Sequence, residues 1–142
     1  MFLGESRHTL DAKNRLRIPA KFRTELGDKY VVTVGSDGCL CVYSNAKFEK
    51  YVEKLESIPN FDLQAQRSIR KILSLAIEAE PDEQGRFILP KNLKDFAKID
   101  KNLVINGNGS KIEIWSEEVW DEYSKLTNLD EELAILGEKY GV

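Results

Sequence analysis

The chain has 142 residues, of which 42% are hydrophobic and 32% are charged, and its formal net charge is −3. This length suits one ordinary domain or two very small ones, with enough apolar residues for a core. No apolar stretch reaches the ~20 residues of a membrane span, and the N-terminus lacks the basic and apolar blocks of a signal peptide. Cys39 and Cys41 are too few for a disulfide framework. We therefore expect a soluble, cytoplasmic protein with no membrane segment.

The charges are distributed unevenly along the chain. Residues 7–23 hold six basic side chains and one acidic one, whereas residues 113–142 hold nine acidic side chains and two lysines. A basic patch on an acidic body can hold a polyanion at one face and repel it elsewhere. For a charge cluster taken alone, ordinary solvated surface is the simpler explanation. The organisation of the chain, described next, is needed to distinguish a solvated surface from a polyanion-binding patch.

The chain contains an internal repeat, in which residues 10–23 align with residues 81–94. Further along, the correspondence shifts by one residue, as a change of loop length would produce. The matched positions are Asp11 and Asp82, Asn14 and Gly85, Arg15 and Arg86, Leu16 and Phe87, Pro19 and Pro90, then Tyr43 and Trp115, Phe48 and Trp120, and Tyr51 and Tyr123. We interpret the chain as a duplication.

In the first half, residues 11–15 form a predicted loop, because Asp11 can accept bonds from nearby backbone amides and Asn14 tolerates a positive φ. The segments around 8–10 and 16–18 have the pattern of short strands, which would make the loop the tip of a hairpin. Pro19 suits the start of a short helix over 20–26.

Gly27 is a natural end for that helix. Two β-rich runs, 30–34 and 39–43, flank a turn over 35–38 and predict two more strands. A helix from Ser44 or Asn45 to about Leu55 completes the first half.

The second half repeats this order, with strands over 86–89, 103–105 and 111–115, a turn over 106–109, a helix from Pro90 and a helix capped by Ser116. Between the halves, an apolar face at helical spacing predicts a helix over 62–79 that Pro81 ends, and a final amphipathic helix covers 129–140. Neither half exceeds about 55 residues, so we expect the halves to share one core about a pseudo-twofold axis. The expected organisation is a first repeat (1–56), a helical connector (57–79), a second repeat (80–126) and a C-terminal helix (127–142).

The start Met1-Phe2-Leu3-Gly4, the segment 8–19 and the duplicated Asp-x-x-x-Arg resemble the MraZ family of bacterial transcriptional regulators. The resemblance covers nearly the whole chain and is weakest after about Leu126. It implies an α+β fold of two AbrB/SpoVT-like swapped-hairpin units that share one core and are flanked by helices. It also implies a nucleoid-associated repressor of its own cell-division and cell-wall operon, without a cofactor. Such proteins bind short direct repeats in double-stranded DNA as ring-shaped homo-oligomers, for which eight or twelve subunits are plausible.

The basic first loop is the candidate DNA-binding site, because lysine and arginine neutralise phosphates and arginine can pair with guanine. Arg15 is the leading candidate for reading a base, and Lys13 and Arg17 are candidates for phosphate or base contacts. Weaker candidates for phosphate contacts are Arg7, Lys21 and Arg23. The alternative role of Arg15 is an ion pair with Asp11, or with Asp82 across the pseudo-twofold axis. Both roles can coexist if Asp11 orients the loop while Arg15 points outward.

The second copy differs where the first is basic. Gln84 replaces Lys13 and Ile88 replaces Arg17, so that residues 78–94 carry one more acidic than basic side chain. A surface with this charge is poorly suited to bind DNA phosphates. We therefore expect the first copy to contact DNA, and Asp82 and Arg86 to serve mainly the fold or the subunit interface.

The sequence does not favour an enzyme, because it has one histidine and no glycine-rich loop followed by Lys and Ser or Thr. Asp11 and Asp82 could form a hydrolytic carboxylate pair, but each has a nearer structural explanation. Cys39, Cys41 and His8 could supply three zinc ligands, although packing of the cysteines in a strand is the simpler interpretation. We therefore expect neither catalytic nor metal-binding residues.

The main alternative function is a protein-interaction module of antitoxin type, because AbrB-like folds also occur in antitoxins. Candidate assembly surfaces are the exposed faces of the 62–79 helix and the helix that carries Trp120 and Tyr123. The simpler interpretation of those two aromatic residues is packing within the chain's own core.

Overall fold

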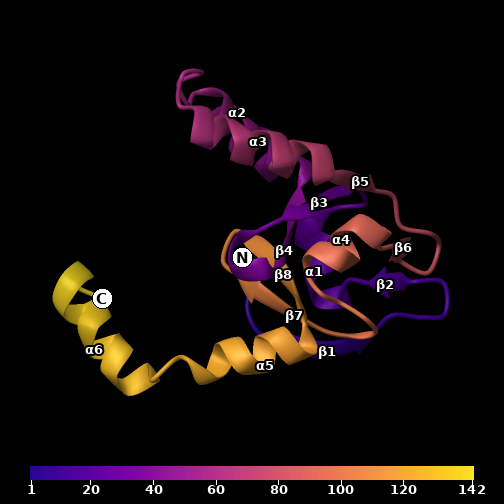
Figure 1. Cartoon of the computed structure of the whole chain (residues 1–142). Helices are drawn as coiled ribbons and strands as arrows, with labels where there is room; N and C mark the ends of the chain where they lie inside the picture. The colour runs from indigo at the N-terminus through magenta and orange to yellow at the C-terminus, as the bar shows by residue number, and fades with distance from the viewer.

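The computed structural model describes all residues from 1 to 142 and contains a six-stranded sheet, a separate two-stranded ribbon and six α-helices (Figure 1). In chain order the elements are β1 (Glu5–Thr9), β2 (Arg15–Arg17), α1 (Ala20–Leu26), β3 (Tyr30–Val34), the 3-10 turn η1 (Ser36–Gly38), β4 (Leu40–Ser44), α2 (Asn45–Glu56), α3 (Leu63–Leu75), β5 (Ile77–Ala79), β6 (Arg86–Ile88), α4 (Lys91–Phe96), β7 (Asn102–Asn108), β8 (Lys111–Ser116), α5 (Glu117–Lys125) and α6 (Leu129–Tyr140). None of these helices is both long and apolar enough to span a membrane.

The two halves interlock through their strands, all of which pair antiparallel. The large sheet has the order β1-β7-β8-β4-β3-β5, so β1 of the first half pairs with β7 of the second, and β5, which follows the connecting helix α3, pairs with β3 of the first half. Corresponding strands meet in the middle, β4 with β8 and β2 with β6. This arrangement confirms the α+β class and the pair of repeated, interlocking units.

One main core lies between the inner face of the large sheet and a second layer made of the ribbon, α1 and α4. Strand side chains alternate between faces, so Leu40 and Ile114 point into this core, and Leu16 and Phe87 close it from the ribbon. Phe22 of α1 and other apolar side chains complete a cluster of 21 buried residues. Neither half could bury its apolar face alone, which explains why both contribute to one core.

The predicted turn and cap residues have the expected conformations. Asn14 and Gly85 have φ of 58° and 76°, and Gly27 ends α1 with φ of 90°. The hydroxyl of Ser44 accepts a hydrogen bond from the backbone N–H of Lys47 at the start of α2. Ser116 caps α5 in the same way.

Three local predictions were wrong. The loop over 11–15 is not a hairpin tip, because β1 and β2 pair with strands of the other half and belong to different sheets. The predicted 62–79 helix ends at Leu75, and residues 77–79 form the edge strand β5, since their backbone groups pair with β3. The predicted 106–109 turn starts late, because β7 continues to Asn108 while it pairs with β8.

Candidate nucleic-acid interface

Each Asp-x-x-x-Arg motif builds the same hydrogen-bonded turn. The Oδ1 atom of Asp11 accepts the backbone N–H groups of Lys13 and Arg15 at 2.9 and 2.8 Å, and its Oδ2 accepts Nε of Arg15 at 2.6 Å. In the second copy, Oδ1 of Asp82 accepts two backbone N–H groups at 2.9 Å, and Oδ2 accepts Nε of Arg86 at 3.1 Å. The backbone N–H of each arginine is the largest cause that lowers the pKa of its aspartate, and the guanidinium lowers it further. Both carboxylates therefore hold a turn.

The residues that follow these turns form one antiparallel ribbon. Arg15 lies opposite Ile88, and Arg17 lies opposite Arg86, on the face away from the core. Leu16 and its partner Phe87 lie between them and are buried. The two repeats thus share a single outward face, whereas their sequences predict a basic surface on the first copy and a separate acidic one on the second.

The cations on this face differ in how firmly they are held. Lys13 and Arg17 are exposed, and their side chains make no hydrogen bond or ion pair within the chain. The side chain of Arg15 is only 26% exposed and is fixed by an ion pair with Asp11. This is the first of the two ion pairs considered for Arg15, with Asp11 or with Asp82. The contact across the pseudo-twofold axis joins Arg86 to Asp11, at 3.9 Å, and does not involve Asp82 and Arg15.

Two helical cations each lie against the turn of the other repeat. Arg23 of α1 packs against the second turn, where a Cβ built on Gly85 would lie 2.4 Å from its Nη1 atom. Lys94 of α4 donates from Nζ to the side-chain oxygen of Asn14 in the first turn, at 2.8 Å. Lys94 was absent from the predicted site, although the repeat contains the signal, because Lys94 follows Arg23 by the same 71 positions that separate Asp11 from Asp82.

The remaining predicted cations lie elsewhere. Arg7 of β1 bonds Asp121 at 2.8 Å and Glu117 at 2.8 Å, both on α5, and these contacts raise its pKa further above the neutral range. Lys21 lies on α1 with its Nζ 5.0 Å from the ring centre of Phe22. The structure therefore gathers Lys13, Arg15, Arg17 and Arg23 at the ribbon and does not bring Arg7 there.

The cysteines lie on the outer face of the large sheet, away from His8. His8 pairs with Leu103, whose side chain is in the core, so the histidine ring and the thiols are on opposite faces. The side chain that joins Cys39 and Cys41 is Glu113, and the three donor atoms lie within 4.8 Å of one another. Glu113 is already engaged, since its carboxylate accepts the indole N–H of Trp115 at 3.1 Å and the amide of Asn108 at 3.3 Å.

Trp120 and Tyr123 pack on the chain itself, but outside the main core. Their rings lie 5.2 and 4.8 Å from the ring of Trp115, centre to centre. Trp115 belongs to a second, smaller apolar cluster on the outer face of β8, and Trp120 packs against that cluster, which does not include Tyr123. The predicted packing within the chain is thus correct, but the predicted place in the main core is not, and Tyr123 remains partly exposed.

Comparison with known proteins agrees with this architecture. The family model described as "MraZ protein, putative antitoxin-like" matches twice, at residues 1–71 and 72–133. Similar proteins include "Transcriptional regulator MraZ" of Caldanaerobacter subterraneus subsp. tengcongensis and of a Thermoanaerobacter species, each 46% identical over 135 residues that cover 94% of both chains. The protein of the same name from Carboxydothermus hydrogenoformans is 46% identical over 123 residues, which cover 87% of this chain and 86% of its own. The chain belongs to the MraZ family.

Proposed function

We propose that this protein is a transcriptional regulator that binds double-stranded DNA through the β2–β6 ribbon. The observation that carries the proposal is the outward face of the ribbon, where Arg15, Arg17 and Arg86 lie together beside Lys13. A two-stranded ribbon fits the major groove, and arginine can pair there with O6 and N7 of guanine. The name shared by the relatives supports the same function.

The two kinds of cation have different roles in this proposal. Arg15 uses Nε to bond Asp11, which leaves its two terminal nitrogens to donate to a base edge from a fixed position. Lys13 and Arg17 are unrestrained and neutralise phosphates, which gives affinity without sequence preference. Arg86 repeats the geometry of Arg15 through Asp82, so it is a second candidate for a base contact. Ile88, which is exposed between them, is suited to contact a thymine methyl group.

Assembly into a ring of several copies, eight or twelve, would present several ribbons to tandem direct repeats. One ribbon makes few contacts, but linking copies raises affinity by ~10² or more through effective concentration. Two helices without any buried residue support such assembly, and they have opposite charge. The first, α3, carries Arg67, Arg70 and Lys71 and no acidic residue; the second, α6, carries four acidic residues and one lysine and projects from the body (Figure 1). We assign α3 of one copy as the partner of α6 in the next, since this head-to-tail contact can close a ring.

The regulated target, by family resemblance, is the protein's own cell-division and cell-wall operon, which the ring would repress from direct repeats upstream. The working protein would then be associated with the nucleoid. The test is fluorescence anisotropy with duplex DNA from upstream of the coding sequence, comparing wild type with Lys13→Ala/Arg17→Ala. Lys50→Ala/Lys54→Ala on α2 is a control with equal loss of charge. Tight binding that only the ribbon variant loses supports the proposal, and absence of wild-type binding at low salt overturns it.

A second candidate function is an antitoxin-type interaction module, which the description of the matching family favours. The two functions differ in what they predict for purified protein. A partner protein recovered at stoichiometric amounts, together with no affinity for upstream DNA, would replace the regulator by this alternative.

A further inference from the structure

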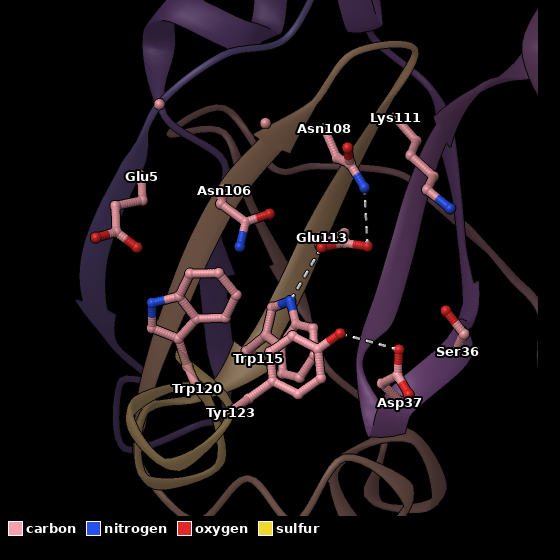
Figure 2. Close-up of a pocket in the computed structure, with 12 residues that line it drawn as sticks. Glu5, Ser36, Asp37, Asn106, Asn108, Lys111, Glu113, Trp115, Trp120 and Tyr123 are labelled. Carbon is pink, nitrogen blue, oxygen red and sulfur yellow. Dashed lines mark hydrogen bonds between the residues drawn. The ribbon is translucent and has the colours of Figure 1, made fainter. Parts of the chain in front are cut away.

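A row of polar side chains crosses the outer face of the large sheet, on the side opposite the ribbon. Glu5 of β1, Asn106 of β7 and Glu113 of β8 are direct cross-strand neighbours, whereas Ile105 and Ile114 beside them point into the core. Above this row lies a cavity of about 540 Å³, drawn in Figure 2. Because the core separates this cavity from the ribbon, it is not part of the proposed DNA-binding face.

Asn106 is the unusual member of this row. It is only 6% exposed, and neither its side-chain oxygen nor its nitrogen has a hydrogen-bond partner in the protein. Buried amide groups are almost always paired, because an unpaired one loses its hydration without compensation. The amide points into the space between Glu5, Trp120 and Glu113, as Figure 2 shows.

The other repeat shows that the fold does not require an unpaired group here. Thr33 lies opposite Cys41 as Asn106 lies opposite Glu113, and Cys41 and Glu113 are matched positions of the two repeats. The hydroxyl of Thr33 donates to the carbonyl of Ile72 on α3, at 2.6 Å. No element of the chain bonds the side chain of Asn106 as α3 bonds that of Thr33. The amide of Asn106 therefore faces a cavity, whereas the hydroxyl of Thr33, at the matching position, faces the carbonyl group of Ile72.

The walls of the cavity limit what can bind. Trp115, Trp120 and Tyr123 form an aromatic side, with ring centres 4.8 to 6.3 Å apart. The charged residues of the lining are Glu5, Asp37, Glu113 and Lys111, so the site is acidic overall. Such a site stacks a flat ring, attracts N–H donors and repels phosphate.

We infer that this cavity binds an amino-substituted nitrogen heterocycle of the nucleobase type, as a free base or nucleoside without phosphate. The amide of Asn106 offers one donor and one acceptor side by side, and such a ring offers the complementary pair, an amino group next to a ring nitrogen. A guanidinium or alkylamine has donors only and would leave the Asn106 nitrogen unpaired. The carboxylate of Glu113, held by Trp115 and Asn108, is placed to accept a further N–H of the ligand.

Intrinsic fluorescence tests this site directly, because the chain has two tryptophans and both line the cavity. The probes are adenosine, purine riboside (the same ring and sugar without the amino group) and AMP. We expect adenosine to change the fluorescence in a saturable way, and purine riboside and AMP to bind at least about tenfold more weakly. No response to adenosine up to about 1 mM, or equal responses to adenosine and purine riboside, would overturn the inference.

A substitution separates ligand binding from structure. Asn106→Val removes both unpaired atoms, so it should abolish the adenosine response without lowering the thermal unfolding midpoint; Asn60→Thr, in the exposed loop between α2 and α3, should change neither. A lower midpoint for Asn106→Val with the adenosine response retained would assign the amide a structural role. Loss of the oligomer in Asn106→Val, measured by light scattering, would show that a second copy fills the cavity. Either result overturns the inference. The first leaves the proposed DNA-binding ribbon untouched, and the second would move the contact between copies from α3 and α6 to this cavity.

Discussion

The different restraint of Arg15 and Arg17 predicts two different losses when each is replaced by alanine. The Arg17 side chain is exposed and makes no hydrogen bond or ion pair within the chain, whereas Nε of Arg15 lies 2.6 Å from Oδ2 of Asp11. A mobile cation is suited to phosphates, and a fixed one is suited to a base edge. Arg17→Ala should therefore weaken binding to any duplex, and Arg15→Ala should mainly reduce discrimination between sequences.

The magnitudes follow from the kind of contact that each variant loses. One phosphate contact contributes about 0.9 to the slope of log K against log salt, so Arg17→Ala should reduce that slope by about 0.9 for each bound copy. Between 50 and 200 mM salt, this makes the variant lose about 3.5-fold less affinity per copy than wild type does. A bidentate base contact is worth about 1–3 kcal/mol, so Arg15→Ala should lose about 5- to 150-fold on the specific duplex.

The assay is fluorescence anisotropy with two labelled duplexes, the upstream repeat and a scrambled duplex of equal composition, over that salt range. Light scattering first confirms that wild type and both variants have the same oligomer size. The reasoning would be refuted if Arg17→Ala left the salt slope unchanged, or if Arg15→Ala lost as much affinity on the scrambled duplex as on the repeat.

Three further predictions concern the turn, the core and the assembly surface. Acidification should loosen the first turn. The pKa of Asp11 is lowered from 3.8 in the folded protein, so the stability that the ionised carboxylate contributes is fully present above pH 3.8. This stability is lost as the pH falls through the pKa of the folded protein. The protection of the Arg15 amide against hydrogen exchange, measured relative to the intrinsic exchange rate at each pH, should fall with this loss in wild type. The same fall in Asp11→Asn would contradict the prediction. Leu16→Ala, at a site 2% exposed, should lower the free energy of unfolding by about 2–5 kcal/mol, whereas Ile88→Ala on the opposite ribbon face should change it by about 0.5 kcal/mol or less, measured by denaturant titration. Changing the three basic residues of α3 to Glu should reduce the oligomer size in light scattering, and changing the acidic residues of α6 to Lys in the same chain should restore it; equal sizes for all three proteins would exclude this contact.

The sequence alone determined the parts of this protein that depend on neighbouring residues. The duplication, most helices and strands, the cap at Ser116 and the left-handed positions Asn14 and Gly85 all follow from residue type and spacing. The Asp-x-x-x-Arg turn belongs to this group, because its hydrogen bonds join atoms within four residues of one another.

Only the tertiary structure decided which strands pair. Residues 77–79 continue the apolar spacing of α3, yet they form β5, because backbone groups of β3 more than forty residues away are available to them. The same long-range pairing makes one ribbon of two turns and brings Lys94 to Asn14. It also leaves Asn106 beside a cavity, while Thr33 in the other repeat is covered by α3. Hydrophobic spacing predicts which face of a segment is buried, but it does not identify the segment that covers that face, since many partners bury the same apolar area.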